Sequence, residues 1–124
     1  MVEVKYTIIK EHDAEIIVRE FEGIVELGDI LESLSFIEKS MMSESVVGII
    51  TDGLKANLKL KISDVEEIIQ FMQNSERLKK LKFAALVNTP ENTIFPTTAH
   101  FKSEMIAIRP FTTKEAALQW ILKF

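Results

Sequence analysis

The sequence predicts a single α/β domain over residues 1–124, a mixed β-sheet with helices packed on it in the order β-β-α-β-α-β-α-β-α. Three observations predict this fold. Residues 2–8 alternate between apolar and polar side chains, as a half-buried strand does. Segments 45–52 and 82–89 are nearly continuous apolar runs, which are typical of strands covered on both faces. Apolar residues at helical spacing between these two runs predict a right-handed crossover and a parallel pair.

The first third of the chain is expected to form a hairpin and a helix. Residues 11–15 supply the turn after the first strand, and residues 16–23 read as its antiparallel partner. A helix is predicted to begin near Gly28 or Asp29, where a small or acidic residue suits the exposed amides. Its buried stripe consists of Ile30, Leu31, Leu34 and Ile37.

The remaining elements follow in order along the chain. A longer helix separates the two apolar strands, with a buried stripe of Val65, Ile68, Ile69, Met72 and Leu78. A third helix is predicted over residues 93–105, with Pro96 in its first turn, where the missing N–H is harmless. A strand at 106–111 and a closing helix at 113–124 complete the domain.

Two segments fit the capping box, in which a hydroxyl accepts from an amide of the first turn and a glutamate reaches back. The first is Ser63 with Glu66, and the second is Thr112 with Glu115. The spacing therefore predicts that Ser63 is first of all a helix cap. Because Ser63 has a hydroxyl group, phosphorylation is the alternative role for this residue.

Composition excludes several classes of function. The formal charge of −4 disfavours a nucleic-acid partner, because phosphate binding needs a concentrated basic face. The absence of cysteine excludes disulfides and thiolate chemistry. The four glycines of the chain do not form a P-loop or a dinucleotide-binding motif, so no cofactor is expected. With no signal peptide and no apolar run of about 20 residues, a soluble cytoplasmic protein without a transmembrane segment is expected.

No catalytic or metal-binding set can be assembled from the sequence. His12 is expected to be a solvated turn residue, and His100 a helix residue rather than a base. No motif places either beside a nucleophilic hydroxyl. Glu66 and Glu67 are helix neighbours that point apart and form no acid–base pair. We therefore expect neither an enzyme nor a metal site.

The order of elements, the aspartate that ends "VVGIITD", the helix that opens at Ser63, "KFAALVNTP" and the closing "FTTKEAALQWI" carry a family resemblance over essentially the whole chain. The sequence resembles the small bacterial SpoIIAA-like domains, stand-alone relatives of the STAS fold. The resemblance implies a STAS-like fold and a role in protein interaction or regulation. The wider superfamily also includes lipid-binding domains.

In the anti-sigma-factor antagonists of this family, an Asp-Ser-Ser-Gly motif opens the helix and its serine accepts phosphate from a partner kinase. The corresponding place here reads Lys61-Ile62-Ser63-Asp64. A phosphate on Ser63 would meet the positive end of the helix but also the carboxylates of Asp64 and Glu66. The departure from the motif argues against a phosphorylation switch of the family's type.

Two surfaces are candidates for binding. Ligands of parallel sheets gather beyond the carboxyl ends of the strands, which predicts a rim there, although turn and cap roles also explain such residues. An excess of large apolar residues predicts a second, apolar surface that also includes Phe36 and Ile94. The rim consists of Asp52, Ser63, Asn88, Thr89 and Thr112, and the apolar surface includes Met41, Met42, Phe95 and Phe101.

Two functions follow from these surfaces. The first is a non-catalytic interaction or regulatory domain with a protein partner, which includes self-association as a homodimer. The second is a small binder of an apolar, lipid-like ligand. An enclosed apolar cavity would favour the ligand binder, whereas an exposed apolar patch would favour the interaction domain.

Overall fold

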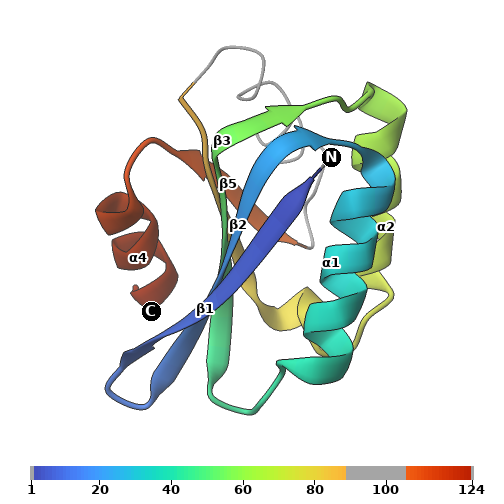
Figure 1. The fold of residues 1–124 in the computed structure, drawn as a ribbon. Helices are drawn as coiled ribbons and strands as arrows, with labels where there is room; N and C mark the ends of the chain where they lie inside the picture. Colours follow the sequence, from blue (N-terminus) through green and yellow to red (C-terminus); the bar gives the residue numbers. More distant parts are fainter. Residues whose placement is uncertain (1, 89–105, 124) are drawn as a thin grey trace.

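A computed structural model describes residues 2–88 and 106–123 of the protein. The described chain forms a five-stranded mixed sheet in the order β1-β2-β3-β4-β5, with α1 and α2 on one face and α4 on the other (Figure 1). This is the predicted α/β architecture, and the third helix predicted over 93–105 lies outside the described residues. The elements are β1 (Glu3–Glu11), β2 (Ala14–Val25), α1 (Leu27–Ser40), β3 (Val46–Leu58), α2 (Ile62–Gln73), the 3-10 helix η1 (Leu78–Lys80), β4 (Lys82–Leu86), β5 (Ala107–Phe111) and α4 (Lys114–Leu122).

Strands β1 and β2 form the predicted antiparallel hairpin, with Glu11 paired to Ala14 across a two-residue turn. His12 occupies this turn with a φ of 56°, in the left-handed region that most side chains avoid. Its side chain is exposed, as predicted. The turn fixes the register that brings Tyr6 of β1 over α1, where its hydroxyl donates to Ser33 Oγ at 2.9 Å.

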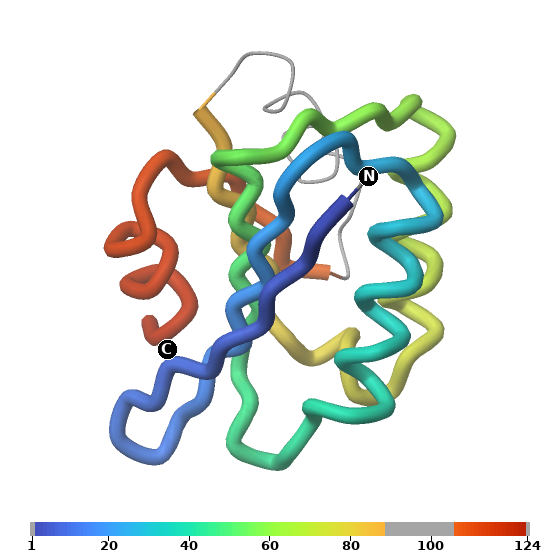
Figure 2. Tube along the Cα trace, in the orientation of Figure 1, coloured from blue at the N-terminus to red at the C-terminus, as the bar shows by residue number. Residues whose placement is uncertain are grey.

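The other strand pairs are parallel. Strand β2 pairs with β3, β3 with β4 and β4 with β5, so the predicted crossover between β3 and β4 is confirmed. The β2–β3 register shifts twice, between Glu15 and Ile16 and between Glu20 and Glu22, and at the second shift β3 carries two residues against one. Such a bulge bends the strand and increases its twist. Beyond it, β2 and β3 continue together to the starts of α1 and α2, at the upper edge of Figure 2.

Alternation along β2 divides the core between the two faces of the sheet. Ile17 and Phe21 belong to the larger core beneath α1 and α2, whereas Ile16 and Val18 belong to a smaller core beneath α4. All four side chains are buried. The buried stripes predicted for α1 and α2 also pack on the larger core, although Leu31 is only partly buried and Leu78 lies on η1.

The smaller core depends on a close approach between α4 and β3. A Cβ atom at Gly48 would lie 2.6 Å from Ile121 Cγ2 and 3.0 Å from the carbonyl oxygen of Lys82. Any side chain at this position would therefore displace α4 or the neighbouring strand. Glycine at position 48 allows Ile121 to be 1% exposed.

Two local predictions are wrong. The strand predicted over residues 45–52 does not end at Asp52, because β3 continues to Leu58. Ser63 does not cap α2, because the helix begins earlier, with Lys61 as its N-cap residue. The side chain that reaches back is Asp64, whose Oδ2 accepts from the Lys61 amide at 2.8 Å.

Helices α1 and α4 are also capped by a side chain near their first turn. At the start of α1, Asp29 Oδ2 accepts from the Glu26 amide at 2.9 Å, so this helix begins two residues before Asp29. The cap of α4 is Thr113 rather than Thr112, since the Thr113 hydroxyl accepts from the Ala116 amide at 3.2 Å. In α1, α2 and α4 an acidic or hydroxyl side chain makes the capping contact, and each of these helices begins one or two residues away from the predicted start.

The corrected cap gives a direct prediction. We expect Asp64→Ala to lower the free energy of unfolding by about 1 kcal/mol, because the Lys61 amide loses its acceptor. Ser63→Ala should change the free energy by less than about 0.5 kcal/mol, as exposed substitutions usually do. Urea denaturation followed by circular dichroism measures both, with Asp29→Ala as the matched control for the same contact in α1. A larger loss for Ser63→Ala than for Asp64→Ala would contradict the assigned cap.

Candidate functional site

The strand register brings most of the predicted rim to one edge of the sheet. Asp52 pairs with Leu86, and Leu86 pairs with Phe111. Thr112 directly follows β5, Asn88 lies two residues after the end of β4, and both are exposed. Thr89 lies outside the described residues.

Asp52 and Ser63 have different settings at this end of the molecule. Asp52 is half-buried, and its Oδ1 accepts from the Leu54 amide at 3.0 Å, within the bulge of β3. Ser63 is exposed in the first turn of α2, at the far end of the β3 extension (Figure 1). Asp52 therefore stabilises the backbone of the bulge, while the Ser63 hydroxyl faces solvent.

Three large aliphatic side chains at this end of the molecule are exposed, which the sequence analysis did not predict. Ile24 is 52% exposed near the end of β2, Leu54 is 40% exposed in the bulge of β3, and Ile62 is 61% exposed as the first residue of α2. They come from segments that meet at the upper edge of Figure 2. Single exposed aliphatic residues are common, whereas a contiguous apolar patch marks an interaction surface.

The predicted apolar surface is only partly described. Met41 and Met42 are half-buried against the larger core at the end of α1. Phe36 is 45% exposed and its ring lies 4.9 Å from that of Tyr6. Phe95, Phe101 and Ile94 lie outside the described residues.

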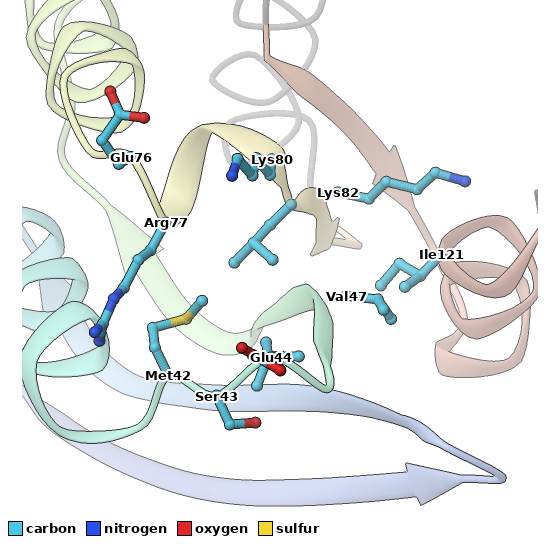
Figure 3. Close-up of a pocket in the computed structure, with 11 residues that line it drawn as sticks. Met42, Ser43, Glu44, Val47, Glu76, Arg77, Lys80, Lys82 and Ile121 are labelled. Atoms are coloured by element: carbon cyan, nitrogen blue, oxygen red, sulfur yellow. The ribbon is translucent and has the colours of Figure 1, made fainter.

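A pocket of about 790 Å³ opens at the opposite end of the sheet, where β3 and β4 begin (Figure 3). It contains charges of both signs, among them Glu44, Glu76, Arg77, Lys80 and Lys82. The sequence indicated basic residues between positions 79 and 82 but did not place them in a pocket.

Several charges of this pocket already have partners. Lys79 Nζ lies 3.0 Å from Glu76 Oε1, and this hydrogen bond, together with the charge of Lys79, holds the pKa of Glu76 below its ordinary value. Lys82 Nζ donates to the carbonyl oxygen of Trp120 at 2.9 Å, near the end of α4. Arg77 Nη1 donates to the carbonyl oxygen of Glu38 at 3.4 Å. These contacts join helix ends and loops, which is a structural role.

Arg19 occupies a more unusual position, in the middle of β2 and only 3% exposed. Its Nε donates to Thr51 Oγ1 at 2.7 Å, and its Nη1 lies 3.5 Å from the carbonyl oxygen of Ile30, at the long end of hydrogen bonding. The guanidinium also lies 5.3 Å from the centre of the Phe21 ring. None of the ion pairs within residues 2–88 and 106–123 involves Arg19.

Arg19 borders a small cavity between the sheet and helices α1 and α2. The cavity has a volume of about 40 Å³, and apart from Arg19 and Thr51 it is lined mainly by apolar residues such as Ile30, Ile68 and Met72. Burial lowers the pKa of Arg19 from its ordinary value to about 10, and interaction with Tyr6 acts in the opposite direction. The guanidinium therefore stays charged at neutral pH in an apolar setting, where a charge is costly.

The described part of the chain contains no cluster of three or more histidine, aspartate or glutamate side chains that could hold a metal ion. Among its helices, none has the length and apolar character that crossing a bilayer requires. His12 lies in the hairpin turn, and His100 lies outside the described residues.

The fold is similar to solved structures, although no family model and no curated protein matches the sequence. An uncharacterised protein of the DUF3478 family with a SpoIIAA-like fold, from Shewanella loihica PV-4, has a TM-score of 0.66 and 13% identity over 98% of this chain and 95% of that one. The anti-sigma factor antagonist SpoIIAA in its unphosphorylated form has a TM-score of 0.56 and 13% sequence identity. The match covers 97% of this chain and 100% of that one. The predicted SpoIIAA-like, STAS-like fold is confirmed.

The contact between Arg19 and Thr51 can be tested by unfolding. We expect Thr51→Val, which keeps the shape of the side chain, to lower the free energy of unfolding by about 1–3 kcal/mol, because a buried charged donor loses its acceptor. In an Arg19→Met background the same substitution should cost less than about 0.5 kcal/mol. Urea denaturation of the four proteins gives the coupling, and Thr7→Val on β1 is an exposed control. Equal losses in both backgrounds would show that Thr51 does not act through Arg19.

Proposed function

We propose that the protein is a non-catalytic interaction or regulatory domain of the cytoplasm, whose partner is another protein or a second copy of the chain. The observation that carries the proposal is the exposure of Ile24, Leu54 and Ile62 at the end of the molecule that also holds Asp52 and Ser63. We call these five residues the rim patch. The SpoIIAA-like fold agrees with such a role without specifying a partner.

The rim patch has the composition that a protein interface requires. Interfaces combine an apolar centre, which supplies affinity, with a polar border that fixes orientation. Ile62 and Leu54 provide apolar area on two elements, and the Ser63 hydroxyl and the Asp52 carboxylate provide polar groups beside them. Burial of an aliphatic side chain contributes about 1.5–3 kcal/mol when it is complete. Ile24, Leu54 and Ile62 are already about half buried, so a partner gains only part of this free energy from each of them.

Phosphorylation of Ser63 is a separate question within this proposal. The exposed hydroxyl lies in the first turn of α2, where the positive helix end and Lys61 would favour a phosphate. Asp64 and Glu66 would oppose it. Because Asp64 holds the Lys61 amide, its carboxylate stays at this helix end. We therefore propose that the rim patch works through shape and apolar contact, with Ser63 unmodified.

The second candidate, a binder of a lipid-like ligand, has one observation in its favour: the apolar cavity beside Arg19. Its volume of about 40 Å³ is far below the roughly 300–1,000 Å³ of pockets that enclose drug-sized ligands. The larger pocket at the other end of the sheet is bordered by charges instead. The sizes and linings of these two spaces favour the interaction domain.

Site-specific photo-crosslinking in bacterial cells tests the rim patch. We expect a photo-reactive phenylalanine analogue at position 62 to form a discrete covalent adduct, because a partner covers this side chain. The matched control carries the analogue at Ile8, which is 44% exposed on β1 near the hairpin turn, away from the rim patch. Leu54→Asp in the same chain should abolish the adduct at position 62 and leave the fold intact.

Native mass spectrometry of the purified protein then identifies the partner. An adduct of twice the chain mass indicates a homodimer, and any other discrete mass indicates a second protein. Equal labelling at positions 62 and 8, or labelling that survives Leu54→Asp, would overturn the proposal. A releasable mass of a few hundred daltons on a monomer would instead favour the lipid-like ligand.

A further inference from the structure

The buried guanidinium of Arg19 has a positive charge for which the described part of the chain supplies no counter-ion. Its Nε and Nη1 donate to neutral oxygens, of Thr51 and Ile30, and the second contact is long at 3.5 Å. Neutral acceptors satisfy hydrogen bonds but do not neutralise the charge. Buried charges in proteins are usually paired or coordinated, since an unpaired one is costly.

The cavity lies directly against this charge. Arg19 is one of its lining residues, and so are Thr51 and Ile30, whose oxygens the guanidinium contacts, so the guanidinium lies beside the cavity. The remaining lining is almost entirely apolar, with Thr51 as its other polar side chain among the described residues. An arginine at one end of an apolar space selects a ligand with a negative planar group and an apolar remainder, because the guanidinium fork matches a carboxylate with two parallel hydrogen bonds.

We propose that this cavity binds a small carboxylate, whose oxygens accept from the Arg19 guanidinium and whose short alkyl part contacts Ile68 and Met72. One water-sized group needs about 10–15 Å³ of such volume, so about 40 Å³ accommodates roughly three. A carboxylate group has three heavy atoms and fills this volume, and a tail of one or two carbons extends into the part of the cavity that is open to solvent. The site takes acids of the size of acetate or propionate and rejects long acyl chains.

The proposed site goes beyond the rim patch and does not depend on it. Arg19 reaches Thr51, which directly precedes Asp52 in β3, whereas the exposed rim residues face solvent. An anion in the cavity would neutralise the guanidinium and stabilise the packing of α1 and α2 on the sheet. A loss of partner binding at the rim patch would leave the carboxylate site intact, and the reverse also holds.

A nuclear magnetic resonance titration of the full chain with sodium propionate tests the proposal. Chloride is exchanged for propionate at constant ionic strength, and the Arg19 Nε–H and Thr51 amide signals are followed. We expect saturable shifts of both signals at millimolar propionate. Propanol, which has the same tail without charge, should produce shifts that do not saturate.

Three variants make the result specific. Arg19→Met removes the charge while keeping an unbranched side chain, and should weaken binding at least tenfold. Ala85→Val adds two methyl groups to a residue that lines the cavity and should weaken binding as strongly while Arg19 stays in place. Arg109→Met removes an exposed arginine of β5 and should leave binding unchanged within twofold. If the Arg19→Met variant does not fold, the affinity of the Ala85→Val variant for propionate tests the proposal.

Several results would overturn the proposal. The absence of saturable shifts up to 100 mM propionate would mean that water alone occupies the cavity. An equal response to chloride would indicate a general anion site, and an equal response to propanol would indicate apolar binding without a role for the charge. Unchanged affinity in Ala85→Val would place the carboxylate outside the cavity.

Discussion

The parallel pairing of β2 with β3 is the constraint on which the rest of this domain depends. The two strands run side by side from Glu15 and Val46 to Val25 and Leu58. Parallel neighbours cannot be joined by a tight turn, so α1 must cross one face of the sheet between them. The pairing also aligns Ile17 with Ile49 on the face of the larger core. The same register places Arg19 opposite Thr51, so the buried hydrogen bond follows directly from the fold.

Much of the fold could be predicted because it depends on patterns that extend over many residues. The apolar runs of β3 and β4 and the helical stripe around Ile68 allow no other arrangement. Helix caps depend on a single contact, and the start of α2 offers two competing ones, Ser63 with Glu66 and the Asp64 carboxylate with the Lys61 amide. Val65 and Ile68 pack on the core and thereby fix the position of the helix along the chain. That position selects the contact between Asp64 and the Lys61 amide.

The features that the sequence analysis missed had weaker signals. After the bulge of β3, Ala56, Leu58 and Leu60 pack on the core while Asn57 and Lys59 between them are exposed, an alternation hidden within a charged segment. Arg19 stands between Ile17 and Phe21 at a spacing of two, which places all three side chains on one buried face. A strand pattern can show that an arginine is buried. Only the three-dimensional structure shows that no carboxylate within residues 2–88 and 106–123 pairs with it.

Helix α4 has a consequence for how the protein is made. The face of the sheet that carries Ile16, Val18 and Ile50 is formed by strands early in the chain, but it is covered by α4, which follows all of them. During synthesis the larger core beneath α1 and α2 can assemble while this second face is still open to solvent. Because Gly48 has no side chain, β3 leaves the space that Ile121 fills when α4 packs on the sheet. The nascent domain therefore passes through a stage in which α1 and α2 already cover one face of the sheet while Ile16, Val18 and Ile50 on the other face are exposed to solvent.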